Sequence, residues 1–322
     1  MDFLNANGIG KKEGNSWVLQ DVSFTLQRSQ KLAFAGATGS GKTTLLKIIA
    51  GLIDPSTGDV YFKQEKIKSP SEKLLPGHPA ITYLSQHFEL RNHYRVKEVL
   101  DMAKNVSNTE AERLYDVCRI SHLLHRWTHQ LSGGERQRIA LTQLLSGNPE
   151  LLLLDEPYSN LDVLHKTILK NVVRDLGEQL GLTVILVSHD PQDVLSWADE
   201  ILVLNEGKAV QQASPKEIYT NPTDGYTAGL FGKYNVLTYE LAKALSAYSD
   251  VEMQDLGRFV RPEEFILIDS GKGLKAVVTE VLFMGSYVEL HLNVAGLNLI
   301  VHTANRNLKK GDEVCLLLQS HH

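Results

Sequence analysis

A glycine-rich turn near the N-terminus combines a lysine with hydroxyl residues, a combination that can hold a chain of phosphates. Its residues are Gly36, Ala37, Thr38, Gly39, Ser40, Gly41, Lys42, Thr43 and Thr44. Glycine lets the backbone bend until several N–H groups face one anion, and a helix that starts behind the turn adds the positive end of its dipole. Lys42 can then reach the terminal phosphates, and the Thr43 hydroxyl can ligate Mg2+.

The segments on either side of this turn distinguish a phosphate loop from a chance cluster of glycines. The apolar residues 32–35 before the turn predict a buried strand, and apolar residues at helical spacing over 45–49 predict a helix after it. Strand, turn and helix in this order are the context that the motif requires. The sequence therefore predicts a phosphate loop.

Two acids and a histidine follow two later apolar runs. Asp155 and Glu156 come directly after the leucines of residues 151–154, and His189 follows residues 183–188. In a parallel α/β sheet, ligands gather at the carboxyl ends of the strands. We therefore expect Asp155 to hold Mg2+ through a water molecule and Glu156 to orient or deprotonate the attacking water. A lone histidine after a strand is more often structural, but His189 lies where a sensor of the γ-phosphate would lie.

A second candidate anion cradle is formed by Ser132, Gly133 and Gly134, immediately before a helical pattern. It has no lysine and follows no strand, which suggests that its phosphate is supplied by another chain. The alternative is an ordinary helix cap, with Ser132 as the N-cap and Glu135 completing a capping box. Both interpretations stay open at this point.

The elements that must position these residues alternate along the chain. Strand-like segments cover residues 17–19, 22–26, 58–62 and 80–84, a helical stretch from residue 96 lies between strands, and residues 199–208 predict a hairpin. The predicted fold is an α/β P-loop NTPase core with a helical subdomain at about 90–145, followed by a small all-β barrel.

Composition excludes several other classes of protein. The chain has 322 residues, of which 43% are hydrophobic and 22% charged, as in ordinary globular proteins. The formal net charge of −5 argues against nucleic acid as the main partner. Residues 1–10 lack a secretory signal pattern, and no apolar run approaches the ~20 residues needed to span a bilayer. Cys118 and Cys315 are far apart in sequence and predict free thiols.

The order of these motifs resembles the nucleotide-binding subunit of an ATP-binding cassette (ABC) transporter. The resemblance covers residues 1 to about 230. It rests on the phosphate loop (36–43), Gln86 after a strand, the LSGGERQ signature (131–137), LLLLDEP (151–157), SNLD (159–162) and His189. Six motifs in the family's order make the resemblance specific.

The resemblance implies a Mg2+-dependent ATPase that works as a head-to-tail pair of cassettes, here a homodimer or a paired cassette. Ser132 and Gly134 would contact the γ-phosphate bound by the other chain, and Asp162 would bridge the two chains. Gln86 would touch Mg2+ or the attacking water, beside the contact with the membrane subunit. The expected catalytic residues are Glu156, His189, Lys42 and Gln86, and the expected Mg2+ ligands are Thr43, Gln86 and Asp155.

The same resemblance implies partners outside the chain. Work at a membrane would require integral permease subunits, and the resemblance also allows for a solute-binding protein. The chain would lie on the cytoplasmic face of the cell membrane as a peripheral subunit. We expect no nucleic-acid partner. An exporter ATPase and a soluble cassette ATPase that does not transport are the alternatives.

The C-terminal residues predict a second domain, which divides the chain into residues 1–233 and 234–322. Short strand-like segments separated by turns resemble a small barrel from residue 258 onward. Residues 260–264, 284–287 and 308–312 resemble the transport-associated OB-type (TOBE) domain of solute-importer ATPases, which favours import over export. An OB-type barrel can also bind oligonucleotides, but these strands carry no stripe of basic and aromatic residues.

Two features depart from the family or invite another interpretation. The family stacks the adenine on an aromatic residue where this chain has Glu13; Trp17 could replace it, or could be a core or edge-strand tryptophan. The histidines at 122, 125 and 129 do not share one helical face with an acid or cysteine, so a metal site is not predicted there.

Overall fold

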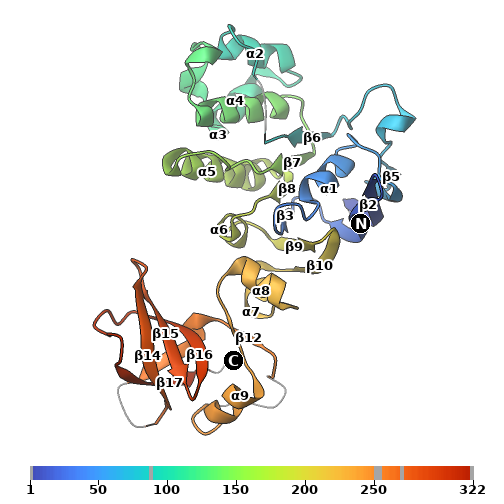
Figure 1. The fold of residues 1–322 in the computed structure, drawn as a ribbon. Coiled ribbons are helices and arrows are strands. Elements are labelled where there is room, and N and C mark those ends of the chain that lie inside the picture. Colours follow the sequence, from blue (N-terminus) through green and yellow to red (C-terminus); the bar gives the residue numbers. More distant parts are fainter. Residues whose placement is uncertain (1–2, 87–89, 250–255, 269–271, 320–322) are drawn as a thin grey trace. The chain divides into compact units, whose positions relative to one another are not determined.

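The computed structural model describes residues 3–86, 90–249, 256–268 and 272–319. The chain forms two compact units, Met1–Pro215 and Lys216–His322 (Figure 1). We describe each unit by itself. The division of the family domains at residues 233 and 234 stays a prediction.

A six-stranded sheet with the order β10-β9-β3-β8-β7-β6 forms the centre of the N-terminal unit. Its strands are β3 (Lys31–Ala35), β6 (Ile81–Leu84), β7 (Leu151–Asp155), β8 (Thr183–Val187), β9 (Glu200–Asn205) and β10 (Lys208–Ala213). All neighbours pair in parallel except β9 and β10, which form the predicted hairpin. Every residue of β7 and β8 is buried, as continuous apolar runs predict for a parallel sheet. The carboxyl ends of these strands therefore carry Asp155 and His189 to one edge of the sheet.

A second, antiparallel sheet has the order β2-β1-β4-β5. Its strands are β1 (Leu4–Glu13), β2 (Ser16–Leu26), β4 (Thr57–Phe62) and β5 (Glu65–Lys66). The sequence pattern predicts no strand at β1 and two separate segments within β2. Register shifts along the β1–β2 pair and a left-handed backbone at Asp21, with φ of 52°, interrupt the alternation that identifies a strand from sequence.

Six helices and three short 3-10 turns are described in the N-terminal unit, and polar side chains cap several of them. The helices are α1 (Lys42–Ile49), α2 (Val96–Ala103), α3 (Asn108–Val117), α4 (Gly133–Leu145), α5 (Val163–Leu180) and α6 (Pro191–Leu195), with 3-10 turns η1 (Pro70–Glu72), η2 (Ser121–Leu123) and η3 (Thr128–Gln130). Figure 1 shows α2, α3 and α4 grouped together, which agrees with the predicted helical subdomain. Ser132 caps α4 and Asp162 caps α5.

The C-terminal unit holds a five-stranded antiparallel sheet with the order β13-β17-β14-β15-β16. Its elements are α7 (Pro215–Thr220), α8 (Gly225–Phe231), β11 (Asn235–Val236), α9 (Tyr239–Leu245), β12 (Phe259–Val260), η5 (Pro262–Glu264), β13 (Phe265–Ile268), β14 (Leu274–Phe283), β15 (Val288–Val294), β16 (Leu297–Thr303) and β17 (Glu313–Leu318). Alternating buried residues on β15 and β16 form the core of this unit. The predicted strands of a small all-β domain are confirmed.

Candidate active site

Close packing against two strands requires glycine at two positions of the phosphate loop. A Cβ atom at Gly36 would lie 2.2 Å from the carbonyl oxygen of Leu204, and one at Gly41 would lie 2.8 Å from that of Val18. Both glycines also have positive φ, 151° and 97°. The loop is therefore held between β2 and β9, and it leads directly into α1, whose first residue is Lys42.

Lys42 lies inside this loop and bonds to its backbone. Its Nζ atom donates to the carbonyl oxygen of Gly36 at 2.7 Å and to that of Ala37 at 2.8 Å. Burial lowers the pKa of the Lys42 ammonium below its ordinary value, while the carboxylates of Glu156 and Asp155 oppose that shift. A longer contact of 3.4 Å joins the ammonium to the Ser40 hydroxyl, so its described partners are all neutral oxygens, and an anion bound in the loop would supply a charged one.

Asp155 connects the phosphate loop to the end of β7. Its Oδ1 atom accepts a hydrogen bond from the Thr43 hydroxyl at 2.9 Å, and its Oδ2 atom accepts one from the Tyr83 hydroxyl at 2.8 Å. Burial, and then the bond to Asp155, raise the pKa of Tyr83, so its hydroxyl stays a donor. Hydroxyl and carboxylate oxygens of this kind are the ligands that Mg2+ prefers, so Thr43 and Asp155 fit the ion.

Glu156 is held in a defined orientation at the same edge of the sheet. Its backbone adopts a left-handed conformation with φ of 48°, and its N–H donates to the carbonyl oxygen of Val187 at 3.0 Å. The carboxylate Oε2 accepts from the Ser159 hydroxyl at 2.9 Å and lies 3.1 Å from Nδ1 of His189. Both contacts are on Oε2, so Oε1 faces no donor from the described residues and can accept a proton from water.

A cavity of about 340 Å3 brings together three residues that the sequence analysis named as catalytic. They are Gln86, Glu156 and His189. Gln86 follows β6, Glu156 follows β7 and His189 follows β8, so three neighbouring strand ends supply them. Ser188, Asp190 and Asp193 also line the cavity.

The second cradle forms a separate cluster at the N-termini of α4 and α5. The Ser132 hydroxyl accepts from the N–H of Glu135 at 3.3 Å, and the Glu135 carboxylate accepts from the N–H of Ser132 at 2.8 Å. This is the predicted capping box. Asp162 caps α5 by accepting from the N–H of His165 at 2.9 Å. Neither Ser132 nor Asp162 is among the residues that line the cavity of Glu156.

Several residues near these groups were not identified from sequence as site residues. Tyr83 lies within a strand that carries no motif, and only the three-dimensional pairing of β6 with β7 brings it to Asp155. Ser159 is the first residue of the SNLD motif, so the sequence could have identified it as a site residue. His165 follows that motif by three positions and contacts both Ser132 and Asp162.

Trp17 lies on β2, an edge strand of the antiparallel sheet. Its side chain is 41% exposed, and the Lys12 ammonium lies 4.5 Å from the centre of its ring. A core position is therefore wrong for Trp17, and the edge-strand interpretation agrees with the structure. Glu13, which takes the family's aromatic position in the alignment, is exposed at the end of β1.

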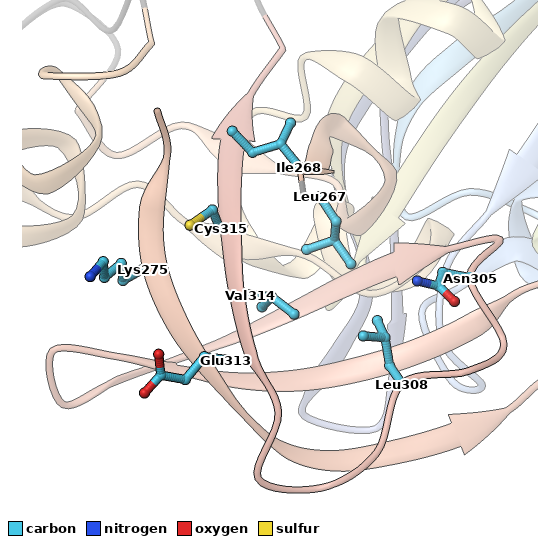
Figure 2. Close-up of a pocket in the computed structure, with 8 residues that line it drawn as sticks. All are labelled: Leu267, Ile268, Lys275, Asn305, Leu308, Glu313, Val314 and Cys315. Atoms are coloured by element: carbon cyan, nitrogen blue, oxygen red, sulfur yellow. The ribbon is translucent and has the colours of Figure 1, made fainter. Parts of the chain in front are cut away.

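The C-terminal unit has a cavity of its own, of about 280 Å3, between β13, β14 and β17 and a nearby loop. Figure 2 shows Leu267, Val314 and Leu308 together on one part of its wall, with Asn305 on the opposite side from Lys275 and Glu313. The polar groups of this lining do not converge on one point, unlike those of the cavity around Glu156.

Comparisons with known proteins agree with this geometry. Residues 19–159 match the ABC transporter family, and residues 259–322 match the TOBE domain family. The chain is 30% identical over 339 residues to the spermidine/putrescine import ATP-binding protein PotA of Borrelia garinii subsp. bavariensis, covering 99% of this chain and 96% of that protein. It is 33% identical over 320 residues to the Fe(3+) ions import ATP-binding protein FbpC of Pseudomonas fluorescens, covering 92% and 88%.

Solved structures share the fold of the N-terminal unit. A nucleotide-free ATP-binding cassette from an ABC transporter superposes with a TM-score of 0.62 at 23% identity, covering 72% of this chain and all 100% of that one. Within residues 3–86, 90–249, 256–268 and 272–319, no helix is both long and apolar enough to pass through a lipid bilayer. The chain therefore belongs to the ATP-binding subunits of ABC transporters, in the group that carries a C-terminal TOBE domain.

Proposed function

We propose that this chain hydrolyses ATP at a site completed by a second copy, and that it thereby powers solute import through separate membrane permease subunits. The observation that carries the proposal is the cavity lined by Gln86, Glu156 and His189, at the same sheet edge as the phosphate loop. Relatives of nearly equal identity are named for the import of spermidine/putrescine and of Fe(3+) ions. Import is the property that these names share, so we assign import and no particular solute.

The residues of the first half-site divide the chemistry between them. The backbone of residues 36–44 and the Lys42 ammonium bind the phosphates of ATP. Glu156, oriented through Oε2 by Ser159 and His189, positions the attacking water and accepts its proton on Oε1. His189 then reports on the γ-phosphate that this water attacks. No covalent intermediate is required, because phosphoryl transfer depends mainly on positioning and on neutralising charge.

Mg2+ is the cofactor that this donor set fits. Thr43 and Asp155 would hold it, with Gln86 from the end of β6, and Tyr83 would keep the Asp155 carboxylate in place. When bound, Mg2+ neutralises charge that develops on the phosphate oxygens. Removal of divalent cations with EDTA should therefore abolish hydrolysis and leave the fold intact.

The second half-site is the cluster at the N-termini of α4 and α5. Ser132, Gly133 and Gly134 would bind the γ-phosphate held by the other copy, and Asp162 would contact that copy. In a single chain, Ser132 and Asp162 do not line the cavity of Glu156, as expected if they serve the site of the other copy. The pair would lie on the cytoplasmic face of the membrane through its permease.

Mixing two inactive variants tests whether the half-sites belong to different copies. Lys42→Ala weakens the first half-site, and Ser132→Arg blocks the second. In a head-to-tail pair, a mixed dimer combines the intact phosphate loop of the Ser132→Arg chain with the intact signature of the Lys42→Ala chain, which gives one complete site. We expect neither variant alone to form a dimer in the presence of ATP. A mixture of the two, each carrying a different tag, should form dimers when ATP and Mg2+ are added.

A co-purification measurement reads out this pairing. Failure of the mixture to pair, while the unmodified chain pairs under the same conditions, would contradict a site shared between copies. A strictly monomeric preparation that hydrolyses ATP at the full rate would contradict it as well.

A further inference from the structure

His165 joins the N-termini of two helices through both nitrogens of its ring. On the first turn of α5, its Nδ1 atom lies 2.7 Å from Oδ2 of Asp162, the residue that caps the same helix. Its Nε2 atom lies 3.3 Å from the hydroxyl oxygen of Ser132, which caps α4. The side chain is 26% exposed, so solvent protons can reach the ring. One imidazole thus connects two residues of the second half-site.

The packing of Gly134 depends on this ring. A Cβ atom at Gly134 would lie 2.6 Å from Cδ2 and 2.8 Å from Cβ and Cγ of His165. The backbone φ of Gly134 is not positive, so conformation alone does not require glycine there. The histidine lies directly against the backbone of the cradle, and its position and that of Gly134 depend on each other.

The partners of the ring determine which way its hydrogen bonds run. A carboxylate only accepts, so Nδ1 of His165 carries a hydrogen and donates it to Asp162. The pKa of Asp162 is lowered, first by the backbone N–H and then by the ring of His165, so Asp162 stays ionised. In the neutral ring, Nε2 is then an acceptor, and the Ser132 hydroxyl donates to it. The hydroxyl proton of Ser132 therefore points toward the imidazole and is not available to an anion.

We propose that His165 is a positioning residue that controls the direction of the Ser132 hydroxyl toward the phosphate bound by the other copy; this inference rests on the function proposed above. When Nε2 takes up a proton from solvent, the ring donates to Ser132 instead of accepting from it. The hydroxyl proton can then turn to a phosphate oxygen. The imidazolium also places a positive charge behind the cradle, where the phosphate charge favours it.

Several charged groups near this cluster form ion pairs that do not include the ring. Behind Ser132, Glu135 forms an ion pair with Arg126 at 3.6 Å. On α5, Lys166 pairs with Asp190 at 2.7 Å and with Asp193 at 2.9 Å. Among the described residues, Asp162 is the carboxylate that directly contacts the ring.

Dimer formation in the presence of ATP, measured as a function of pH, tests this role. The Glu156→Gln chain serves as the parent because it should bind ATP without consuming it. To this parent we add either His165→Leu, which removes both bonds, or His165→Gln, whose amide can bond to Ser132 but does not titrate. His122→Gln, at a histidine in the 3-10 turn η2, is the matched control.

We expect His165→Leu to weaken ATP-dependent pairing by about tenfold at about pH 6, where a protonated ring frees the Ser132 hydroxyl for the phosphate; this is the scale of a lost hydrogen bond at each of two equivalent sites. Monomer binding of ATP should not change. His165→Gln should restore most of the ATP-dependent pairing. In the parent, pairing should become stronger from about pH 8 to about pH 6, the range in which histidine titrates, and His165→Gln should lack this increase. All of these chains keep His189, so the difference between them isolates His165.

A double-mutant cycle with Ser132→Ala separates this role from a purely structural one. If His165 acts through Ser132, His165→Leu costs little more once the hydroxyl is gone. If the losses of pairing in the two single variants add up in the double variant, the inference is overturned. The same pH dependence in the parent and in His165→Gln would also overturn it. In both cases, ATP-dependent pairing of the parent would still support the proposed function. A parent that binds ATP but never pairs overturns the proposed function, and with it this inference.

Discussion

The two units of the molecule bury charged side chains for opposite purposes. In the N-terminal unit, Lys42 and Asp155 are buried at the edge of a sheet, beside a cavity lined by other polar groups. In the C-terminal unit, Arg261 is 1% exposed and donates to the carbonyl oxygens of Tyr219, Ala228 and Gly232. Glu289, also 1% exposed, accepts from Lys233 at 2.7 Å.

The partners of a buried charged side chain, more than its burial, show whether it serves the reaction or stabilises the fold. The described partners of Arg261 and Glu289 belong to the unit's own framework, and His291 and His302 add contacts to Glu289 at 3.2 Å and 3.4 Å. Glu156 in contrast has both of its side-chain contacts on one oxygen, which leaves the other for a reactant. Substitutions at matched positions in the two units can break or sharpen this distinction.

The same change at two carboxylates should give the largest difference. We expect Glu156→Gln to reduce ATP hydrolysis by about 10^2- to 10^4-fold, because an amide cannot accept a proton from water. Glu289→Gln should leave the hydrolysis rate within about twofold and lower stability instead, since it leaves Lys233 without a charged partner. Steady-state turnover and thermal unfolding of both variants measure the contrast. Equal loss of turnover in both would show that the distinction is false.

Loss of Arg261 should destabilise the C-terminal unit. We expect Arg261→Met to lower the free energy of unfolding of this unit by about 3 kcal/mol, because several buried carbonyl oxygens lose their donor. The three tryptophans, Trp17, Trp127 and Trp197, all lie in the N-terminal unit, so their fluorescence follows that unit alone. Circular dichroism in urea follows both units.

The control for this experiment is Arg306→Met, at an exposed arginine of the same unit. It should leave the urea profile almost unchanged. A shift of the tryptophan transition by Arg261→Met, as large as that seen by circular dichroism, would mean that the units do not unfold separately.

Tyr83→Phe should have a smaller effect, confined to the Mg2+ requirement. The variant removes one hydrogen bond to Asp155 and leaves the aromatic ring in place. We expect about a fivefold increase in the Mg2+ concentration that half-saturates hydrolysis, which corresponds to about 1 kcal/mol. Titration of the rate with Mg2+ at saturating ATP measures it. An unchanged Mg2+ requirement would assign Tyr83 to packing alone.

The smallest effect we expect is on folding stability at acidic pH, and it again concerns Glu289. Desolvation raises the pKa of Glu289, but Lys233, His291 and His302 together outweigh it, so that the pKa is lowered. Its stabilising contribution is therefore present above the ordinary glutamate pKa of about 4.3 and is lost as pH falls through the lower folded-state value. The unmodified chain should lose stability more steeply than Glu289→Gln below about pH 5. Parallel acid profiles for the two chains would contradict this.

Local sequence predicted the parts of the molecule that depend on local chemistry. The phosphate loop, the acids at the end of β7 and the cap of α4 lie where the sequence predicted them, because each depends on a few adjacent residue types. The strands β13 and β17 lie within the region from residue 258 onward where short strand-like segments and turns predicted a small β domain.

What the sequence could not supply depends on pairing between distant segments. Tyr83 acquires its role only because β6 pairs with β7, and β1 forms a strand despite glycines and register shifts that conceal its alternation. His165 resembles any polar residue on a helix until Ser132, 33 positions earlier, is brought against it. These contacts are set by the register of the sheet and by the packing of helices.

The narrow fit of the phosphate loop has a consequence for how this subunit could be re-engineered. With Gly36 against Leu204 and Gly41 against Val18, the curvature of the loop is inherited from the strands that enclose it. A side chain at either position would have to displace a strand as well as the loop, so phosphate binding cannot be retuned at these two glycines without remodelling the sheets around them.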